Sequence, residues 1–126
     1  MIEIIRANAE HIISLAHKHL GRNIGYDQSG VEWLDAYIQT LHNDSNPESE
    51  ELISVLGSYL GECIIHTFGG HWAEIDGTWG VQFDSRNAAF PFSKVAKQLD
   101  HGAEDSVLNF FTAIPLIFLN RGRSAE

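Results

Sequence analysis

The chain has 126 residues, of which 44% are hydrophobic and 20% are charged. These proportions are ordinary for a soluble globular protein and argue against intrinsic disorder of the whole chain, and the length predicts a single domain over residues 1–126. The net charge is −9, which argues against nucleic acid as a partner because phosphate binding needs a basic patch.

Residues 7–20 predict the first helix, because apolar side chains recur there at helical spacing. Asn8 is placed to be its N-cap, and Gly21 is placed to end it. Residues 21–28 contain two glycines and an asparagine and predict a loop. The side chains expected on the buried face of this helix are Ile12, Ile13, Leu15, Ala16, His19 and Leu20.

Residues 30–42 predict a second helix, and Ser29 and Glu32 have the spacing of a capping box at its start. Trp33 and Tyr37 form a short aromatic stripe beside the main apolar one. The main stripe steps by three and four residues and consists of Val31, Leu34, Ile38 and Leu41.

The third predicted helix starts with Asn46 as its N-cap and Pro47 at its first position. Three acidic residues then occupy the first turn, where the positive end of the helix dipole favours them. The helix is expected to run to about Thr67. Its expected buried face consists of Leu52, Ile53, Leu56, Leu60, Cys63, Ile64 and Thr67.

Two glycines, Gly57 and Gly61, lie four residues apart inside this third helix. Each costs about 1 kcal/mol relative to alanine in a helix interior. We expect this cost to be offset by packing, because two glycines on one face let another part of the backbone approach closely. Close approach of a ligand is the alternative interpretation.

After Gly69-Gly70 the apolar period changes from that of a helix to that of a strand. Asp76-Gly77 stands between two alternating segments, which predicts a β-hairpin that pairs residue 75 with 78 and residue 72 with 81. Residues 87–90 are expected to add a third strand. One face of the hairpin, to be covered by helices, is expected to carry Trp72, Glu74, Trp79, Val81 and Phe83.

Pro91 is placed to start a short helix through Leu99, with its apolar residues turned inward. The last helix is predicted over residues 103–119, with Pro115 kinking it or ending it early. It is apolar over more than half of its circumference, so it is expected to be the central buried helix or part of a dimer interface. The predicted fold class is therefore α+β, with about five helices packed on a β-hairpin or a small three-stranded antiparallel sheet.

A single cysteine, Cys63, excludes an intramolecular disulfide and a zinc site built on cysteines. The chain start lacks the basic and apolar regions of a signal peptide. The longest apolar run, Val107 to Leu119, is interrupted by polar residues and falls short of the roughly 20 residues that span a bilayer. We therefore expect a cytoplasmic protein with no membrane partner.

No motif predicts catalysis or a cofactor, because nucleotide-binding glycine loops and the nucleophile elbow are missing from the sequence. His17 and His19 would point about 200° apart on a helix, which is a poor metal chelate. Glu62 and His66, four residues apart, are the minimum for general base chemistry, but no nucleophile accompanies them. Cys63 is better explained as a buried structural thiol.

Four short motifs follow one another between residues 50 and 112: Tyr59-Leu-Gly-Glu62, Gly69-Gly-His-Trp72, Pro91-Phe92 and Gly102-x-x-Asp105-Ser106. Together they resemble a family of small bacterial domains of unknown function. That family carries no established activity to transfer. Similar small acidic domains occur as immunity proteins beside secreted toxins, and this is an analogy only.

The acidic residues are concentrated in the middle of the chain, since residues 23–85 contain eleven of them and no Lys or Arg. Solubility alone is one interpretation. The other is a protein-interaction module, immunity or antitoxin-like, that uses this acidic face to bind a basic protein such as a nuclease toxin. The binding residues expected for it are Trp33, Asp35, Tyr37, Asp44, Glu48, Glu50 and Glu51.

Two further hypotheses belong to other functional classes. One is a small-molecule-binding domain or minor enzyme, with a pocket between the third helix and the hairpin lined by Tyr59, Glu62, His66, Trp72 and Glu74. The other is a homodimer formed through the Phe-rich last helix. None of the three hypotheses requires a metal or a cofactor.

Overall fold

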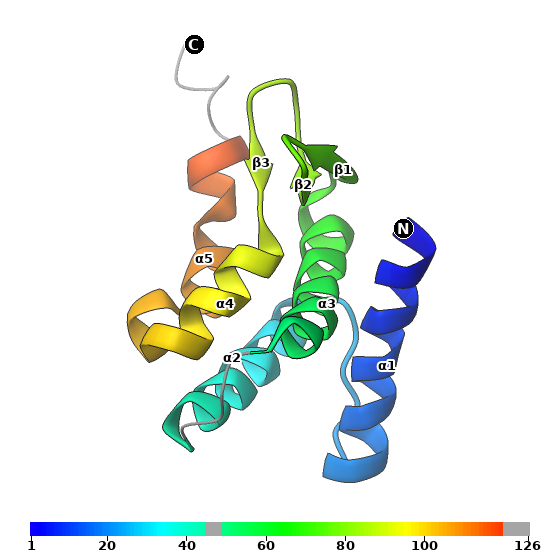
Figure 1. Ribbon diagram of the computed structural model, residues 1–126, viewed down its shortest axis with the longest axis vertical. Helices are drawn as coiled ribbons and strands as arrows, with labels where there is room; N and C mark the ends of the chain where they lie inside the picture. Colours follow the sequence, from blue (N-terminus) through cyan, green and yellow to red (C-terminus); the bar gives the residue numbers. More distant parts are fainter. Residues whose placement is uncertain (45–48, 120–126) are drawn as a thin grey trace.

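The computed structural model describes residues 1–44 and 49–119 (Figure 1). It contains five α-helices, a short 3-10 turn, a π-helical turn and a three-stranded antiparallel sheet. The predicted α+β class is therefore confirmed. The elements are α1 (Ile2–Leu20), α2 (Gln28–Asn43), α3 (Glu50–Phe68), β1 (His71–Ile75), β2 (Thr78–Gln82), β3 (Ala88–Ala89), α4 (Pro91–His101), η1 (Gly102–Asp105), α5 (Val107–Ile114) and η2 (Pro115–Leu119).

The central element of the fold is α3, not the last helix. Every residue of α3 from Leu56 to Ile64 is buried, because α1, α2 and α4 all pack against it and the sheet meets its C-terminal end. By contrast, α5 has only 8 residues, and only Val107, Phe111 and Ile114 are buried in it. The prediction that the last helix is central is wrong. α5 is short because the 3-10 turn η1 occupies the residues before it and Pro115 ends its regular hydrogen bonding.

The two α3 glycines explain how neighbouring elements come so close. A Cβ atom at Gly61 would overlap the indole ring of Trp72 from β1, and one at Gly57 would lie 3.0 Å from the Cα atom of Phe92 in α4. The glycines therefore let the sheet and α4 pack directly onto the α3 backbone. The packing interpretation is confirmed, and the face is filled by protein side chains.

Several helix starts differ from those predicted. α1 begins at Ile2 because Ile5 and Ala9 extend the buried stripe toward the N-terminus, and Asn8 lies inside the helix instead of capping it. α2 is capped by Asp27, whose carboxylate accepts the N–H of Gly30 at 2.9 Å. Ser29 is therefore not the N-cap. It lies inside the first turn of α2, and the Asp27 side chain makes the capping hydrogen bond.

At the start of α3, the cap is Ser49, whose Oγ accepts the N–H of Leu52 at 3.1 Å. The predicted cap at Asn46 and Pro47 lies outside the described residues. Glu50 and Glu51 occupy the first turn of the helix as predicted. Ser106 caps α5 in the same way, so that helix begins at Val107 rather than at residue 103.

Helix ends also show corrections. Gly21 ends α1 in a left-handed conformation as predicted, but His19 and Leu20 are exposed because the last turn of α1 extends past α3 (Figure 1). Thr67 is likewise exposed near the end of α3. The predicted buried faces are therefore one turn too long at their C-terminal ends.

The hairpin register is confirmed, with Ile75 paired to Thr78 and Trp72 paired to Val81. Asp76 and Gly77 both have positive φ, of 52° and 82°, as a two-residue type I′ turn requires. The third strand is confirmed as β3, which pairs with β2.

The C-terminal end of the described chain leaves apolar side chains exposed. Leu116 is 74% exposed and Ile117 is 47% exposed, both in the π-helical turn η2. The homodimer through the last helix stays a prediction, and these two side chains are where it would form. In the described residues no single helix is long and apolar enough to cross a membrane, and the one pair that meets the criteria together, Pro91–Asp105 with Val107–Leu119, is bent by 93°.

Gly61→Ala tests the packing role of the glycines. Alanine normally stabilises a helix interior, but here its methyl group meets Trp72, and overpacking of this kind costs about 1–3 kcal/mol. We expect a lower free energy of unfolding in urea. Thr112→Ala, at an exposed position of α5, is the control and should change stability little. A stabilised Gly61→Ala variant would contradict the proposed contact.

Candidate functional site

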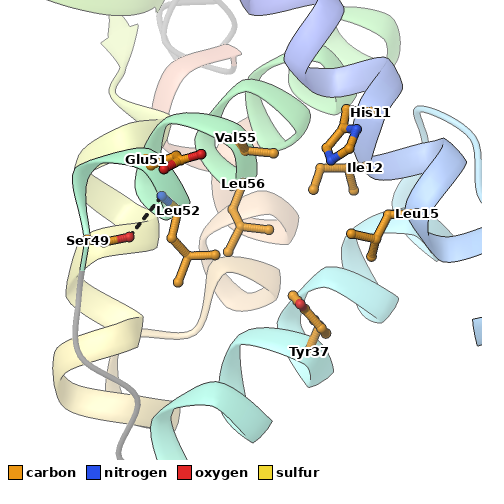
Figure 2. A pocket seen from close by; sticks show the side chains of 9 residues that line it. All are labelled: His11, Ile12, Leu15, Tyr37, Ser49, Glu51, Leu52, Val55 and Leu56. Carbon is orange, nitrogen blue, oxygen red and sulfur yellow. Dashed lines mark hydrogen bonds between the residues drawn. The ribbon is translucent and has the colours of Figure 1, made fainter. Parts of the chain in front are cut away.

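A groove with a cavity of about 240 Å³ lies between α1, α2 and the first turns of α3 (Figure 2). α1 and α2 each pack against α3, so α3 forms the floor and the other two helices form the walls. The lining residues are His11, Ile12 and Leu15 of α1, Tyr37 of α2, and Ser49, Glu51, Leu52, Val55 and Leu56 at the start of α3. We call this site the acidic groove.

Helical spacing explains why these side chains meet. In α1, His11 and Leu15 are four residues apart and share the face that turns toward α2. In α3, Leu52 and Leu56 are likewise four apart, and they form the apolar floor. Every lining residue except Ser49, the N-cap of α3, therefore projects from a helix whose backbone hydrogen bonds hold it rigidly.

Tyr37 is held in the groove wall by an aromatic stack. Its ring lies 5.2 Å from that of Trp33, with the two planes only 10° apart. Trp33 is itself 7% exposed and contacts the ring of Tyr59 edge-on. Tyr37 thus presents a fixed aromatic surface, while Trp33 supports it from inside the core.

The rim of the groove carries negative charge without a basic partner. Glu51 lines the groove, and Glu50 and Asp44 are exposed at the neighbouring ends of α3 and α2. Among residues 1–44 and 49–119, every ion pair of a carboxylate is made with a histidine, and none involves these three acids. The charge on this rim is therefore available to another molecule.

The structure brings together only part of the binding set predicted from the acidic residues. Tyr37 and Glu51 line the groove, and Trp33 lies behind Tyr37. Asp44 and Glu50 are exposed but do not line the groove, and Glu48 lies outside the described residues. Sequence reasoning missed the apolar contribution of α1, although His11, Ile12 and Leu15 belong to a recognisable helical stripe.

Asp35 has a structural role that the charge pattern did not reveal. Its Oδ1 accepts the hydroxyl of Ser106 at 2.6 Å and the N–H of Leu108 at 3.2 Å, so it helps to cap α5. Beside it, the buried Gln98 donates to the Asp35 carbonyl and accepts the N–H of Val107. The carboxylate of Asp35 is therefore occupied within the fold.

The second predicted site forms a cluster around Glu62. Glu62 is buried, accepts the indole N–H of Trp72 at 2.8 Å and lies 3.5 Å from Nε2 of His66. The exposed His66 ring packs 4.7 Å from the ring of Tyr26. Glu74 is not part of this cluster, because it lies on the exposed part of the hairpin.

Tyr59 and Cys63 lie beneath this cluster in the core. The Tyr59 hydroxyl donates to the carbonyl of Gly25, and burial raises its pKa far above its ordinary value. Burial also raises the pKa of the Cys63 thiol to about 12, so the thiol stays protonated at neutral pH. These groups hold the loop before α2 against α3 and are not poised for nucleophilic chemistry.

A cavity of about 320 Å³ lies between the start of α1 and the hairpin, and the five predicted residues do not line it. Its walls come from the start of α1, Ser54 of α3, the hairpin residues Gly77 to Trp79, and Phe92 of α4. The Trp72 ring fills the space over Gly61 where the pocket was expected. The predicted pocket between the third helix and the hairpin stays a prediction.

Comparisons with known proteins add no family assignment. No protein-family model, curated protein or solved structure matches the chain. The resemblance across residues 50–112 therefore stays a prediction. In the described part of the chain, no three His, Cys, Asp or Glu side chains are grouped to hold a metal ion.

Asp35→Ala and Asp44→Ala separate the structural acid from the surface acid. Removing the Asp35 carboxylate leaves the Leu108 N–H and the Ser106 hydroxyl without their acceptor, which costs about 1–3 kcal/mol. The exposed Asp44 should change stability by less than about 0.5 kcal/mol. Urea unfolding of both variants checks this. Equal stability of the two variants would contradict the capping role.

Proposed function

We propose that the chain is a protein-interaction domain that binds a basic protein through the acidic groove. The observation that carries this proposal is an apolar cavity whose rim bears an exposed carboxylate, Glu51, which forms no ion pair with residues 1–44 or 49–119. An apolar centre with a polar, charged rim is the usual anatomy of a protein interface.

The lining of the groove suits side chains of a protein partner. Its cavity of about 240 Å³ has room for one or two apolar side chains. Tyr37 adds the kind of rigid aromatic contact that often dominates binding energy at interfaces.

The charge distribution supports a basic partner. Residues 23–85 contain no Lys or Arg, so the α2 and α3 sides of the groove carry no permanent positive charge. A surface of one sign speeds the approach of an oppositely charged protein and makes the association rate sensitive to salt. The proposed biological form is a cytoplasmic immunity or antitoxin-like protein that neutralises a basic nuclease toxin.

Glu51→Lys and Tyr37→Ala test this function, with Glu74→Lys as the matched charge reversal outside the groove. The tagged proteins are used to capture partners from lysate at low and moderate salt, and the affinity of the identified partner is then measured for each variant. We expect about tenfold weaker binding for Glu51→Lys and for Tyr37→Ala, because a charge pair or an aromatic anchor is lost.

The control should bind like the original chain, since Glu74 lies on the hairpin away from the groove. Equal affinity for all four proteins would contradict the proposal. So would binding that salt does not weaken.

A second candidate function is favoured by the cavity beside the hairpin. Its volume of about 320 Å³ falls within the range of small-molecule pockets, and Trp79 and Phe92 offer aromatic surface to an apolar ligand. A ligand bound there should raise the melting temperature and alter tryptophan fluorescence, and Trp79→Ala should abolish both effects. A panel of apolar metabolites that leaves both signals unchanged would remove this candidate.

A further inference from the structure

We infer that the acidic groove receives an amphipathic α-helix of the partner, which inserts an apolar side chain between α1 and α2 and places Lys or Arg beside Glu51. This inference rests on the proposed function and specifies the chemistry of the partner. It concerns the conformation of the bound segment, which the net charge alone does not determine.

The first argument concerns backbone hydrogen bonds. His11, Ile12, Leu15 and Tyr37 lie inside α1 and α2, where backbone N–H and C=O groups are already paired within their own helices. Ser49, at the end of the floor, uses its Oγ to cap Leu52 (Figure 2). An extended segment in this groove would lose water from its backbone without gaining partners, whereas a helix satisfies its own backbone.

The second argument is the position of the sheet. Adding a strand to a sheet edge is the usual way to bind an extended peptide. Here the three-stranded sheet lies at the opposite end of α3 from the groove, beside the C-terminal end of that helix (Figure 1). No sheet edge borders the groove, because every residue that lines it belongs to α1, α2 or the start of α3.

The third argument is the arrangement of the walls. α1 and α2 both lie against α3 and pack little against each other, so they leave a channel with an apolar floor of Leu52, Val55 and Leu56. Packed helices approach to about 8–10 Å when side chains of one fit between those of the other. Leu56 is already buried, so a guest helix would pack its apolar side chain on the half-buried Leu52 and Val55.

Charge sets the composition of the guest helix. Glu51 lies at the groove, and Glu50 and Asp44 lie at the adjoining ends of α3 and α2. Lys or Arg one helical turn from the apolar anchor would therefore meet negative charge and no competing cation from α2 or α3.

The test uses two labelled peptides of defined composition. The first is a stapled helix of Ala, Leu and Lys, with Leu at positions i and i+4 and Lys beside them. The second has the same residues without the staple and with one central Ala replaced by Pro, which breaks the helix. Fluorescence anisotropy measures both affinities for the full chain, and methyl NMR locates the contact.

We expect the stapled helix to bind at least about tenfold more tightly than the Pro peptide, since it has less conformational freedom to lose. Its binding should shift the methyl signals of Ile12, Leu15 and Leu52. Glu51→Lys should weaken it about tenfold. Glu74→Lys, which is exposed on the hairpin, should leave it unchanged.

The outcomes distinguish this inference from the proposed function. Equal groove binding of both peptides, weakened by Glu51→Lys, would overturn the helical guest and leave the basic partner in place. No groove shift with either peptide, or no effect of Glu51→Lys, would overturn both. A dimer of the chain alone in light scattering, dissociated by Glu51→Lys, would show that a second copy occupies the groove and would also overturn the inference.

Discussion

The whole fold depends on the close contact of other elements with the α3 backbone at Gly57 and Gly61. Phe92 of α4 occupies the space that a side chain at position 57 would need, and Trp72 of β1 occupies the corresponding space at position 61. This brings α4 and the sheet directly onto α3. The Trp72 indole then reaches the buried carboxylate of Glu62, so the apolar contact also provides the partner that this charged group needs. The middle of α3, from Leu56 to Ile64, is enclosed in this way. Its first turns and its last turn stay accessible, and the acidic groove forms at the first turns.

The hairpin and the order of the elements could be predicted from the sequence because their signals are local. Asp76-Gly77 between alternating segments specifies its own register, and Pro91 marks the start of α4. The helix starts were harder to predict from the sequence. Residues close to Asp27 and Ser49 are equally good N-caps when they are judged in isolation. The sequence did not predict which helix is central either. α5 has the most apolar sequence of the helices and was therefore expected to be the most buried. Burial, however, depends on how many elements surround a helix.

The candidate site shows the same division between local and tertiary information. Charge and aromatic spacing singled out Tyr37 and Glu51, which line the groove, but these signals treat all acids of the middle stretch alike. Asp35 belongs to the same stretch, yet its carboxylate bonds to Ser106 and Leu108, which no local pattern connects to it. The groove forms only because α1 and α2 both pack against α3. The sequence therefore shows that its apolar residues lie on helix faces, but it does not show that these faces meet in one site.

The hydrogen bonds of Asp35 also have a consequence for the order of folding. They join residues that are 71 and 73 positions apart in sequence, whereas α5 has only 8 residues and is too short to be stable alone. α5 therefore gains a stable first turn only after α2 has docked beside α4. Contacts of such long range form late in folding, since the chain must first close a large loop. Amide protons of α5 would then gain protection from exchange after those of α1 and α3, and α5 would be the last of the five α-helices in the described chain to become native.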